Sequence, residues 1–187
     1  MESLSRYQIL FDNYLENNKQ KSKPHGLYAP IEYILSLGGK RLRPLLALLA
    51  TEAFGNKPED ALPAALSVEV FHNFTLIHDD IMDQAPLRRG SPTVHNKWDE
   101  NTGILSGDAM LIQAYQCLES YPNKLFVKLI NHTSKTALEV CEGQQYDMDF
   151  ETQKDVTISA YLEMIRLKTA VLVGHSLKIG AWIGNAS

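Results

Sequence analysis

The stretch that decides the fold runs Val68-Glu-Val-Phe-His-Asn-Phe-Thr-Leu-Ile-His-Asp-Asp-Ile-Met-Asp83. Apolar residues recur along it at helical spacing, and three aspartates stand at its end. Asp79 and Asp83 are four residues apart, so a helix places them on one face, with Asp80 beside them. Carboxylates this close repel one another unless they hold a cation, and they suit Mg²⁺, which is often shared with substrate phosphates. The pattern therefore predicts a magnesium site on Asp79 and Asp83, against the alternative of a solvated acidic helix end.

The rest of the chain is also patterned with a helical period, and no segment alternates over the length of a strand. We expect a basic break at 19–24 and a loop at 84–92. The sequence predicts an all-α fold in one domain, an antiparallel bundle with short connections. The expected helices cover residues 1–18, 27–37, 42–54, 60–83, 93–100, 103–120, 123–148 and 157–183.

Composition excludes several classes of protein. The chain has 187 residues, of which 44% are hydrophobic and 21% charged, as in an ordinary globular domain. A net charge of −4 gives no indication of a nucleic-acid partner. Cys117 and Cys141 lack metal-ligand spacing, which indicates reduced cysteines in a cytoplasmic protein. We expect neither a signal peptide nor a membrane span.

Two basic clusters flank the aspartates in sequence. Gly38-Gly-Lys-Arg-Leu-Arg-Pro44 combines glycines, which let the backbone turn tightly, with three cations that suit an anion. Its alternative is a helix stop with solvated charges. Arg88 and Arg89 follow the aspartates in a short loop. They either form salt bridges at the surface or bind phosphates that the metal bridges. Acidic and basic groups side by side are what a diphosphate site needs.

Weaker signals lie elsewhere. Gln144 and Asp147 share a helical face, and Lys168-Thr169 stands on the last expected helix. His72 shares a face with Asp79 and is either a buried core histidine or a ligand. Glu69-x-x-His72 also resembles half of a di-iron site, but the sequence holds no second Glu-x-x-His, so we set that interpretation aside.

Taken together, these residues resemble the (E)-polyprenyl diphosphate synthase family. The resemblance implies antiparallel helices around a deep cavity, and condensation of an allylic diphosphate with isopentenyl diphosphate. The resemblance alone leads us to expect a homodimer. The motifs that carry it, in order, are Gly-Gly-Lys-Arg-Leu-Arg-Pro, His-Asp-Asp-x-x-Asp, Arg-Arg-Gly-x-Pro-x-x-His, Gly-Asp-Ala, Gly-Gln-x-x-Asp and Lys-Thr-Ala.

The resemblance also implies roles for individual residues. Asp79 and Asp83 match the motif that holds Mg²⁺ on the allylic diphosphate, with Asp80 beside them, and Arg88 matches a contact to that diphosphate. Positions that match the isopentenyl diphosphate site are Lys40, Arg43, His72 and Arg89. Positions that match the allylic side, near the departing diphosphate, are Gln144, Lys168 and Thr169. The group expected to carry the chemistry comprises Asp79, Asp80, Asp83, Arg88 and Lys168.

Product length is expected to depend on the wall below the aspartates. Phe74 lies about one and a half helical turns before Asp79, where a bulky ring would stop a growing chain. Thr75 beside it is small. In the family this pattern resembles synthases of fifteen- or twenty-carbon products. Plain core packing of Phe74 is the alternative, and the two are compatible.

The sequence departs from the family in one respect. The family carries a second Asp-Asp-x-x-Asp motif on a later helix, and the chain reaches Ser187 without one. We therefore expect the N-terminal part of a synthase that binds diphosphate and Mg²⁺ but turns over poorly by itself. One alternative is a non-catalytic partner subunit or inactive fragment. A class I terpene synthase is another, although it needs no isopentenyl site.

Overall fold

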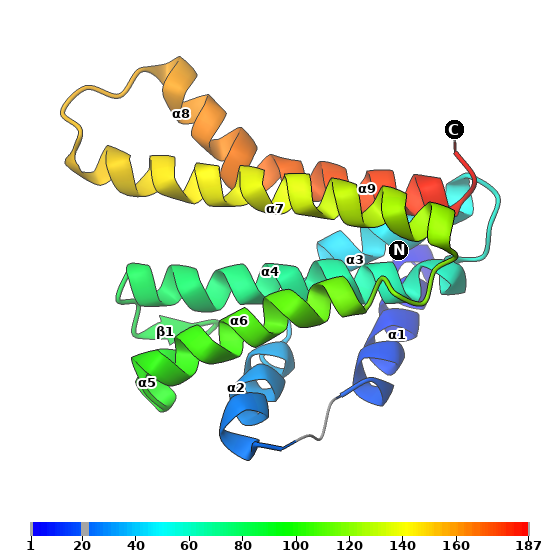
Figure 1. Ribbon diagram of the computed structural model, residues 1–187, viewed down its shortest axis with the longest axis horizontal. Helices are drawn as coiled ribbons and strands as arrows, with labels where there is room; N and C mark the ends of the chain where they lie inside the picture. Colours follow the sequence, from blue (N-terminus) through cyan, green and yellow to red (C-terminus); the bar gives the residue numbers. More distant parts are fainter. Residues whose placement is uncertain (1, 20–22, 187) are drawn as a thin grey trace.

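The computed structural model describes residues 2–19 and 23–186, and it confirms the all-α fold (Figure 1). The short 3₁₀ helix η1 (Pro58–Ala61) leads into α4, and the π-helix η2 (Arg166–Ala170) joins α8 to α9. The α-helices are α1 (Glu2–Asn17), α2 (His25–Ser36), α3 (Leu42–Ala53), α4 (Leu62–Met82), α5 (Val94–Lys97), α6 (Glu100–Gln116), α7 (Asn123–Thr152), α8 (Ile158–Ile165) and α9 (Val171–Ile183).

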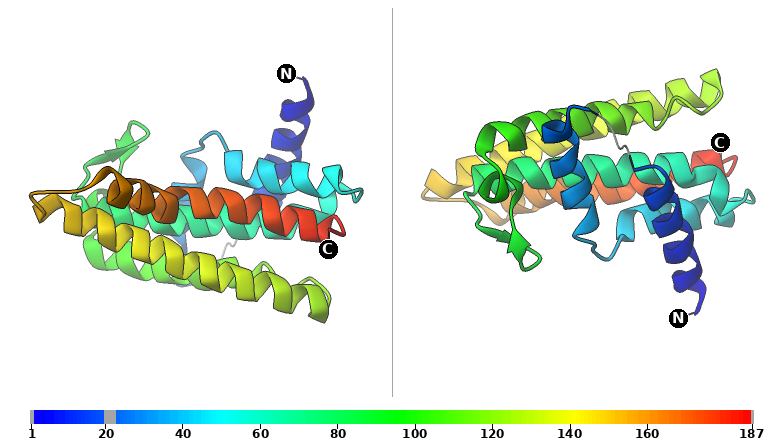
Figure 2. Two further views of the ribbon diagram at one scale, coloured as in Figure 1. Left: turned by 90° about the horizontal axis from the view of Figure 1, so that it is seen from above. Right: turned by 90° about the horizontal axis from the view of Figure 1, so that it is seen from below.

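Helix α4 is the centre of the fold. Pro58 and Pro63 stand in the entry turns of η1 and α4, where their missing N–H groups cost nothing. The helix is buried along most of its length because its neighbours surround it. It packs most extensively against α6 and also against α3, while α7 and α9 run side by side over it (Figures 1 and 2). The aspartates therefore stand at the end of a rigid, buried element.

Helix α9 is fastened to α3 by close backbone contact. A Cβ added at Gly180 would lie 2.2 Å from the carbonyl oxygen of Ala47. The hydroxyl of Thr51 donates to the carbonyl of Gly180 at 2.9 Å. This contact sets the position of α9, and with it the position of the π-helix that precedes it.

The structure corrects several sequence predictions. The expected loop at 84–92 contains a feature that the sequence did not indicate, a two-residue antiparallel ladder of β1 (Leu87–Arg88) and β2 (Ser91–Pro92). Its turn residues, Arg89 and Gly90, have φ of 53° and 78°, as a tight hairpin requires. The helix expected at 93–100 is a single turn, and α7 continues past Met148 to Thr152.

Two predictions extend beyond the described residues. Residue 1 of the first expected helix and residues 20–22 of the expected break lie outside them. Within the described part of the chain, no helix is long and apolar enough to cross a membrane.

Candidate functional site

A pocket of about 270 Å³ lies between α4, α7 and the junction of η2 with α9. Its apolar lining includes Val140, Met148 and Leu172, and charged groups stand among them. The pocket brings together eight of the residues predicted from sequence, namely Arg43, His72, Phe74, Thr75, Asp79, Gln144, Lys168 and Thr169. An apolar space with a few convergent charges is the usual form of a ligand site.

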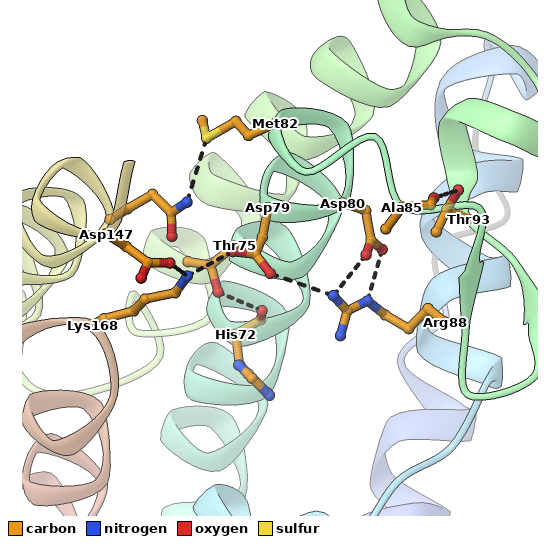
Figure 3. Close-up of polar contacts among 11 residues, drawn as sticks. His72, Thr75, Asp79, Asp80, Met82, Ala85, Arg88, Thr93, Asp147 and Lys168 are labelled. Carbon is orange, nitrogen blue, oxygen red and sulfur yellow. Dashed lines mark hydrogen bonds and ion pairs between the residues drawn. The ribbon is translucent and has the colours of Figure 1, made fainter. Parts of the chain in front are cut away.

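Lys168 connects α4 to α7 at this pocket. Its Nζ lies 3.1 Å from Oδ1 of Asp79, and it also donates a short hydrogen bond to Asp147 (Figure 3). Burial acts to lower the pKa of Lys168, but the hydrogen bonds to Asp147 and Asp79 outweigh it, so the pKa is raised. Lys168 is therefore a cation that two carboxylates hold in place.

Arg88 is held by Asp80 in the same way. Its Nε and Nη2 donate to the two carboxylate oxygens of Asp80 at 2.7 and 2.6 Å, a bidentate pair. Nη2 also lies 3.4 Å from Oδ2 of Asp79 (Figure 3). The hydrogen bond to Asp80 raises the pKa of Arg88. Only 1% of the Asp80 side chain is exposed, so this carboxylate serves first to fix Arg88.

Asp83 caps the C-terminus of α4 and does not line the pocket. Burial, followed by the negative charge of Asp79, raises the pKa of its carboxyl. Among the described residues, no three carboxylate, imidazole or thiol groups converge on one point. Two carboxylates completed by waters and substrate phosphates nevertheless make an ordinary Mg²⁺ site, so the donors fit that ion.

Arg43 and His72 form the other polar wall of the pocket. Nη1 of Arg43 lies 3.2 Å from Nε2 of His72. Burial, reinforced by the charges of Arg43 and Arg89, lowers the pKa of His72 to about 3, so the imidazole is neutral. Nε of Arg43 is buried without an acceptor among the described residues. A buried donor without a partner favours an anionic ligand here.

Arg89 and Lys40 lie outside the pocket lining. The guanidinium of Arg89 packs against Gly39, where an added Cβ would lie 2.9 Å from Cζ of the arginine. Gly39 has φ of 134°, a conformation open to glycine, which explains the residue type at this point in the sequence. Lys40 is exposed.

Arg41 corrects the interpretation of the first basic cluster. It is only 7% exposed, its guanidinium pairs with Glu69, and it donates to the carbonyl of Leu35 at 2.6 Å. The anion that this arginine meets is thus a buried carboxylate of the protein. Glu69 also accepts from Asn73 at 3.0 Å, so its hydrogen bonds account for it without a metal.

Phe74 is 8% exposed and lines the pocket. Its ring packs edge-to-face on His78 at 4.9 Å and on Phe71 at 5.5 Å. Thr75 also lines the pocket, and its hydroxyl donates to the carbonyl of His72. The expected role of this wall in product length stays a prediction.

Sequence reasoning missed two close contacts that shape the site. An added Cβ on Gly143 would lie 2.2 Å from the backbone nitrogen of Lys168, so the glycine lets η2 press against α7. A Cβ on Gly107 would lie 2.4 Å from Nε2 of His78. Both glycines stand in motifs quoted above, but only the packing shows what they make room for.

Comparisons with known proteins agree with this geometry. The polyprenyl synthetase family model matches residues 24–187. A geranylgeranyl diphosphate synthase of Methanosarcina mazei is 50% identical over 168 residues, which cover 89% of this chain and 52% of the relative. A geranylgeranyl pyrophosphate synthase of Geoglobus acetivorans is 42% identical over 174 residues, which cover 92% of this chain and 54% of the relative.

Solved structures give the same result. The crystal structure of a geranylgeranyl pyrophosphate synthase is 56% identical with a TM-score of 0.98, covering all of this chain and 57% of that one. That of the Geoglobus acetivorans synthetase is 39% identical with a TM-score of 0.95, covering 98% of this chain and 61% of that one. The chain spans about half the length of the curated relatives it matches. The resemblance inferred from the order of the motifs is confirmed, and the chain belongs to the polyprenyl synthetase family.

Proposed function

We propose that the protein is a prenyltransferase that condenses isopentenyl diphosphate with an allylic diphosphate to give a product of fifteen or twenty carbons. The observation that carries the proposal is a pocket in which Asp79 and Lys168 stand beside an apolar space lined by Phe74, Val140 and Leu172. The charged groups suit the diphosphate end of a prenyl diphosphate, and the apolar wall suits its hydrocarbon end.

The allylic diphosphate binds at the aspartate end. Asp79 and Asp83 would hold Mg²⁺, which supplies Lewis acidity toward the departing diphosphate. Lys168 and Arg88 take up negative charge as the allylic C–O bond ionises. Gln144 and Thr169 line the same end of the pocket and orient the reacting carbon.

Isopentenyl diphosphate binds on the side of Arg43 and His72. The unpartnered Nε of Arg43 supplies a donor for a diphosphate oxygen. His72 is neutral, so one ring nitrogen can donate while the other accepts. Arg89 adds positive charge near this position, and Lys40, three residues before Arg43 in the chain, is a further cation for the same diphosphate.

The apolar wall protects the reaction from water. An allylic carbocation reacts with water as readily as with a double bond, so the pocket has to exclude solvent from the reacting carbon. Val140 and Leu172 present hydrocarbon there, and Phe74 limits the length of the chain that fits. No side chain is needed as a nucleophile, and the last proton passes to the released diphosphate.

We further propose a cytoplasmic homodimer. Both cysteines are free thiols, which suits a reducing compartment. Ile104, Leu105 and Ile112 leave apolar side chains 42%, 61% and 59% exposed on α6. A second copy that covers this face would remove them from water. Sedimentation of the wild-type chain, compared with a variant carrying Leu105→Lys and Ile112→Lys, tests this arrangement.

The test of the function is incubation of the 187-residue chain, verified by intact mass, with Mg²⁺, labelled isopentenyl diphosphate and an allylic diphosphate. We expect label in a longer prenyl diphosphate, at a rate for this chain alone below about 1 s⁻¹. Asp79→Asn should abolish incorporation, whereas Asp12→Asn, an exposed aspartate on α1, should not. A folded wild-type chain that incorporates no label contradicts the proposal.

The same assay separates the alternatives. A terpene synthase would convert the allylic diphosphate without consuming isopentenyl diphosphate. A partner subunit would incorporate no label alone but would change the product length of a complete synthase mixed with it. The polar wall of Arg43 and His72 favours the elongating enzyme, because a terpene synthase has no second diphosphate to bind.

A further inference from the structure

His78 connects helix α6 to the pocket wall that Phe74 and Thr75 form. It lies one helical turn after Phe74 on α4, and it lines the same pocket. The rings of His78 and Phe74 pack edge-to-face with their centroids 4.9 Å apart. The imidazole also contacts α6, the helix that packs most extensively against α4. Through this side chain, the position of α6 is therefore transmitted to the pocket.

Three residues of α6 hold the imidazole of His78. Its Nε2 lies 3.2 Å from the carbonyl oxygen of Ile104, and because a carbonyl oxygen can only accept, Nε2 donates in this hydrogen bond. Nε2 also lies 3.8 Å from Oδ1 of Asp108. An added Cβ on Gly107 would lie 2.4 Å from Nε2 and 2.6 Å from Cδ2, so the ring occupies space that a larger residue would fill. The Gly-Asp-Ala motif, which has no part in the function proposed above, thus forms the surface on which this ring packs.

We infer that His78 is a positioning residue that sets the depth of the pocket, and that Gly107 determines where its imidazole lies. The inference rests on the proposed function, because it names what determines the length of the prenyl chain that the site accepts. Phe74 supplies a bulky ring at the end of the pocket, and the packing of α6 on α4 determines how far that ring and the imidazole reach into it. Chain length therefore depends on the contact between two helices as well as on the size of one side chain.

Removal of the imidazole should deepen the pocket. In His78→Ala the ring of Phe74 either stays in place or moves into the vacated space, and in both cases the pocket gains the volume of an imidazole. A prenyl chain that fills this volume makes new contacts and leaves water. We expect the preference for a twenty-carbon over a fifteen-carbon ligand to rise at least about fivefold, roughly the effect of burying one more methylene group.

An alanine at position 107 should have the opposite effect. Ordinary van der Waals contact begins at 3.4 Å, so a Cβ at 2.4 Å from Nε2 forces the imidazole to move by about 1 Å. The imidazole moves rather than the helix, because it is the end of one side chain whereas α6 packs extensively on α4. Since the ring both touches α6 and lines the pocket, a movement away from α6 narrows the pocket. The preference for the longer ligand should fall about fivefold.

A double variant tests whether the two positions act through one contact. When His78→Ala removes the imidazole, the three atoms nearest to a Cβ at position 107 are gone, so Gly107→Ala should change nothing further. Gly103→Ala is the matched control, because Gly103 is also buried on α6, one turn earlier. Its added Cβ would instead lie 2.9 Å from Cδ1 of Ile81, which does not line the pocket, so the preference should stay unchanged.

The measurement is calorimetric titration of the 187-residue chain with farnesyl and geranylgeranyl thiolodiphosphates, unreactive analogues of the two chain lengths, in the presence of Mg²⁺. The quantity compared is the ratio of the two dissociation constants. General damage to the diphosphate end of the site changes both constants and leaves their ratio unaltered. If Gly107→Ala does not fold, the double variant, which lacks the clash, should fold and bind both analogues as His78→Ala does.

The inference is overturned if His78→Ala leaves the ratio unchanged, if Gly107→Ala shifts it equally with and without His78, or if Gly103→Ala shifts it as much as Gly107→Ala. Incorporation of labelled isopentenyl diphosphate would then still support the proposed function. If the ratio shifts as expected but the chain incorporates no label, the proposed function is refuted and the selection of chain length by His78 stands.

Discussion

Gly143 and Lys168 are in such close contact that a Cβ on the glycine would lie 2.2 Å from the backbone nitrogen of the lysine. Gly143→Ala must therefore push η2 away from α7 and move Lys168 from Asp79. We expect the free energy of unfolding to fall by about 1–3 kcal/mol, as for other overpacked sites. Binding of Mg²⁺ with pyrophosphate should fall with it.

Gly174→Ala is the matched control for that variant. Gly174 is exposed in the interior of α9, and an added Cβ meets no atom within 4 Å. Alanine should raise the free energy of unfolding by up to about 1 kcal/mol, because it favours the helix over glycine. Urea denaturation of both variants measures the two changes in the free energy of unfolding. Equal changes in the same direction would show that the close contact at Gly143 is unimportant.

The two adjacent arginines of the hairpin should differ in their effect on stability. Arg88→Gln leaves the carboxylate of Asp80 buried without its partner, so we expect a loss of about 3 kcal/mol in the free energy of unfolding. Arg89→Gln removes a guanidinium that packs on Gly39, and the loss should stay below about 1 kcal/mol.

A double variant with Arg88→Gln and Asp80→Asn tests the cause. It removes the uncompensated charge and should recover part of the stability lost by Arg88→Gln alone. Chemical denaturation of the single and double variants supplies the comparison, and strictly additive losses would show that the two side chains are not coupled.

Phe74→Ala should lengthen the product by opening the pocket beyond Thr75. The measurement is chromatography of the labelled prenyl products after removal of the diphosphate. Phe126→Ala, which truncates a half-buried phenylalanine outside the pocket, should leave product length unchanged. An unaltered product distribution in Phe74→Ala would leave the ring with a packing role only.

Acid should destabilise the protein through two buried histidines. Burial, with nearby positive charge, lowers the pKa of His72 and His175 to about 3 each. Since a histidine in the unfolded chain titrates near 6.5, below that pH the unfolded state binds protons that the folded state does not. The free energy of unfolding should therefore fall as the pH decreases from about 6.5 toward 3, by up to about 1.4 kcal/mol per pH unit for each histidine.

Urea denaturation at intervals from about pH 7 to pH 5 measures this slope. His175→Gln, which removes one of the two buried imidazoles, should make the slope about half as steep. A free energy of unfolding that is flat across this interval would contradict the account, because both imidazoles would then titrate alike in the folded and unfolded states.

Local signals were sufficient to predict most of the fold. Prolines 58 and 63 marked the entry to the central helix, and Gly38-Gly39 separated α2 from α3, because each acts on its own stretch of backbone. The order of the motifs also anticipated the pocket, since eight predicted residues line it.

Features that depend on distant contacts could not be predicted in this way. Arg41, between Lys40 and Arg43, looks in sequence like a third phosphate ligand. Its φ of 48° instead turns it toward Glu69 on another helix. Nothing in residues 166–170 themselves predicts a π-helix. Its position is explained only by its close backbone contact with Gly143 on α7.

The tight hairpin at Leu87–Pro92 has a consequence for how this loop can vary. Arg88 lies in its strand and reaches Asp80, while Arg89 lies in its turn and reaches Gly39, beside the start of α3. Two neighbouring positions in one chain thus supply opposite sides of the site. Inserting or deleting a single residue here would turn each arginine side chain to the other face of the hairpin. This loop should therefore not tolerate the insertions that most surface loops accept.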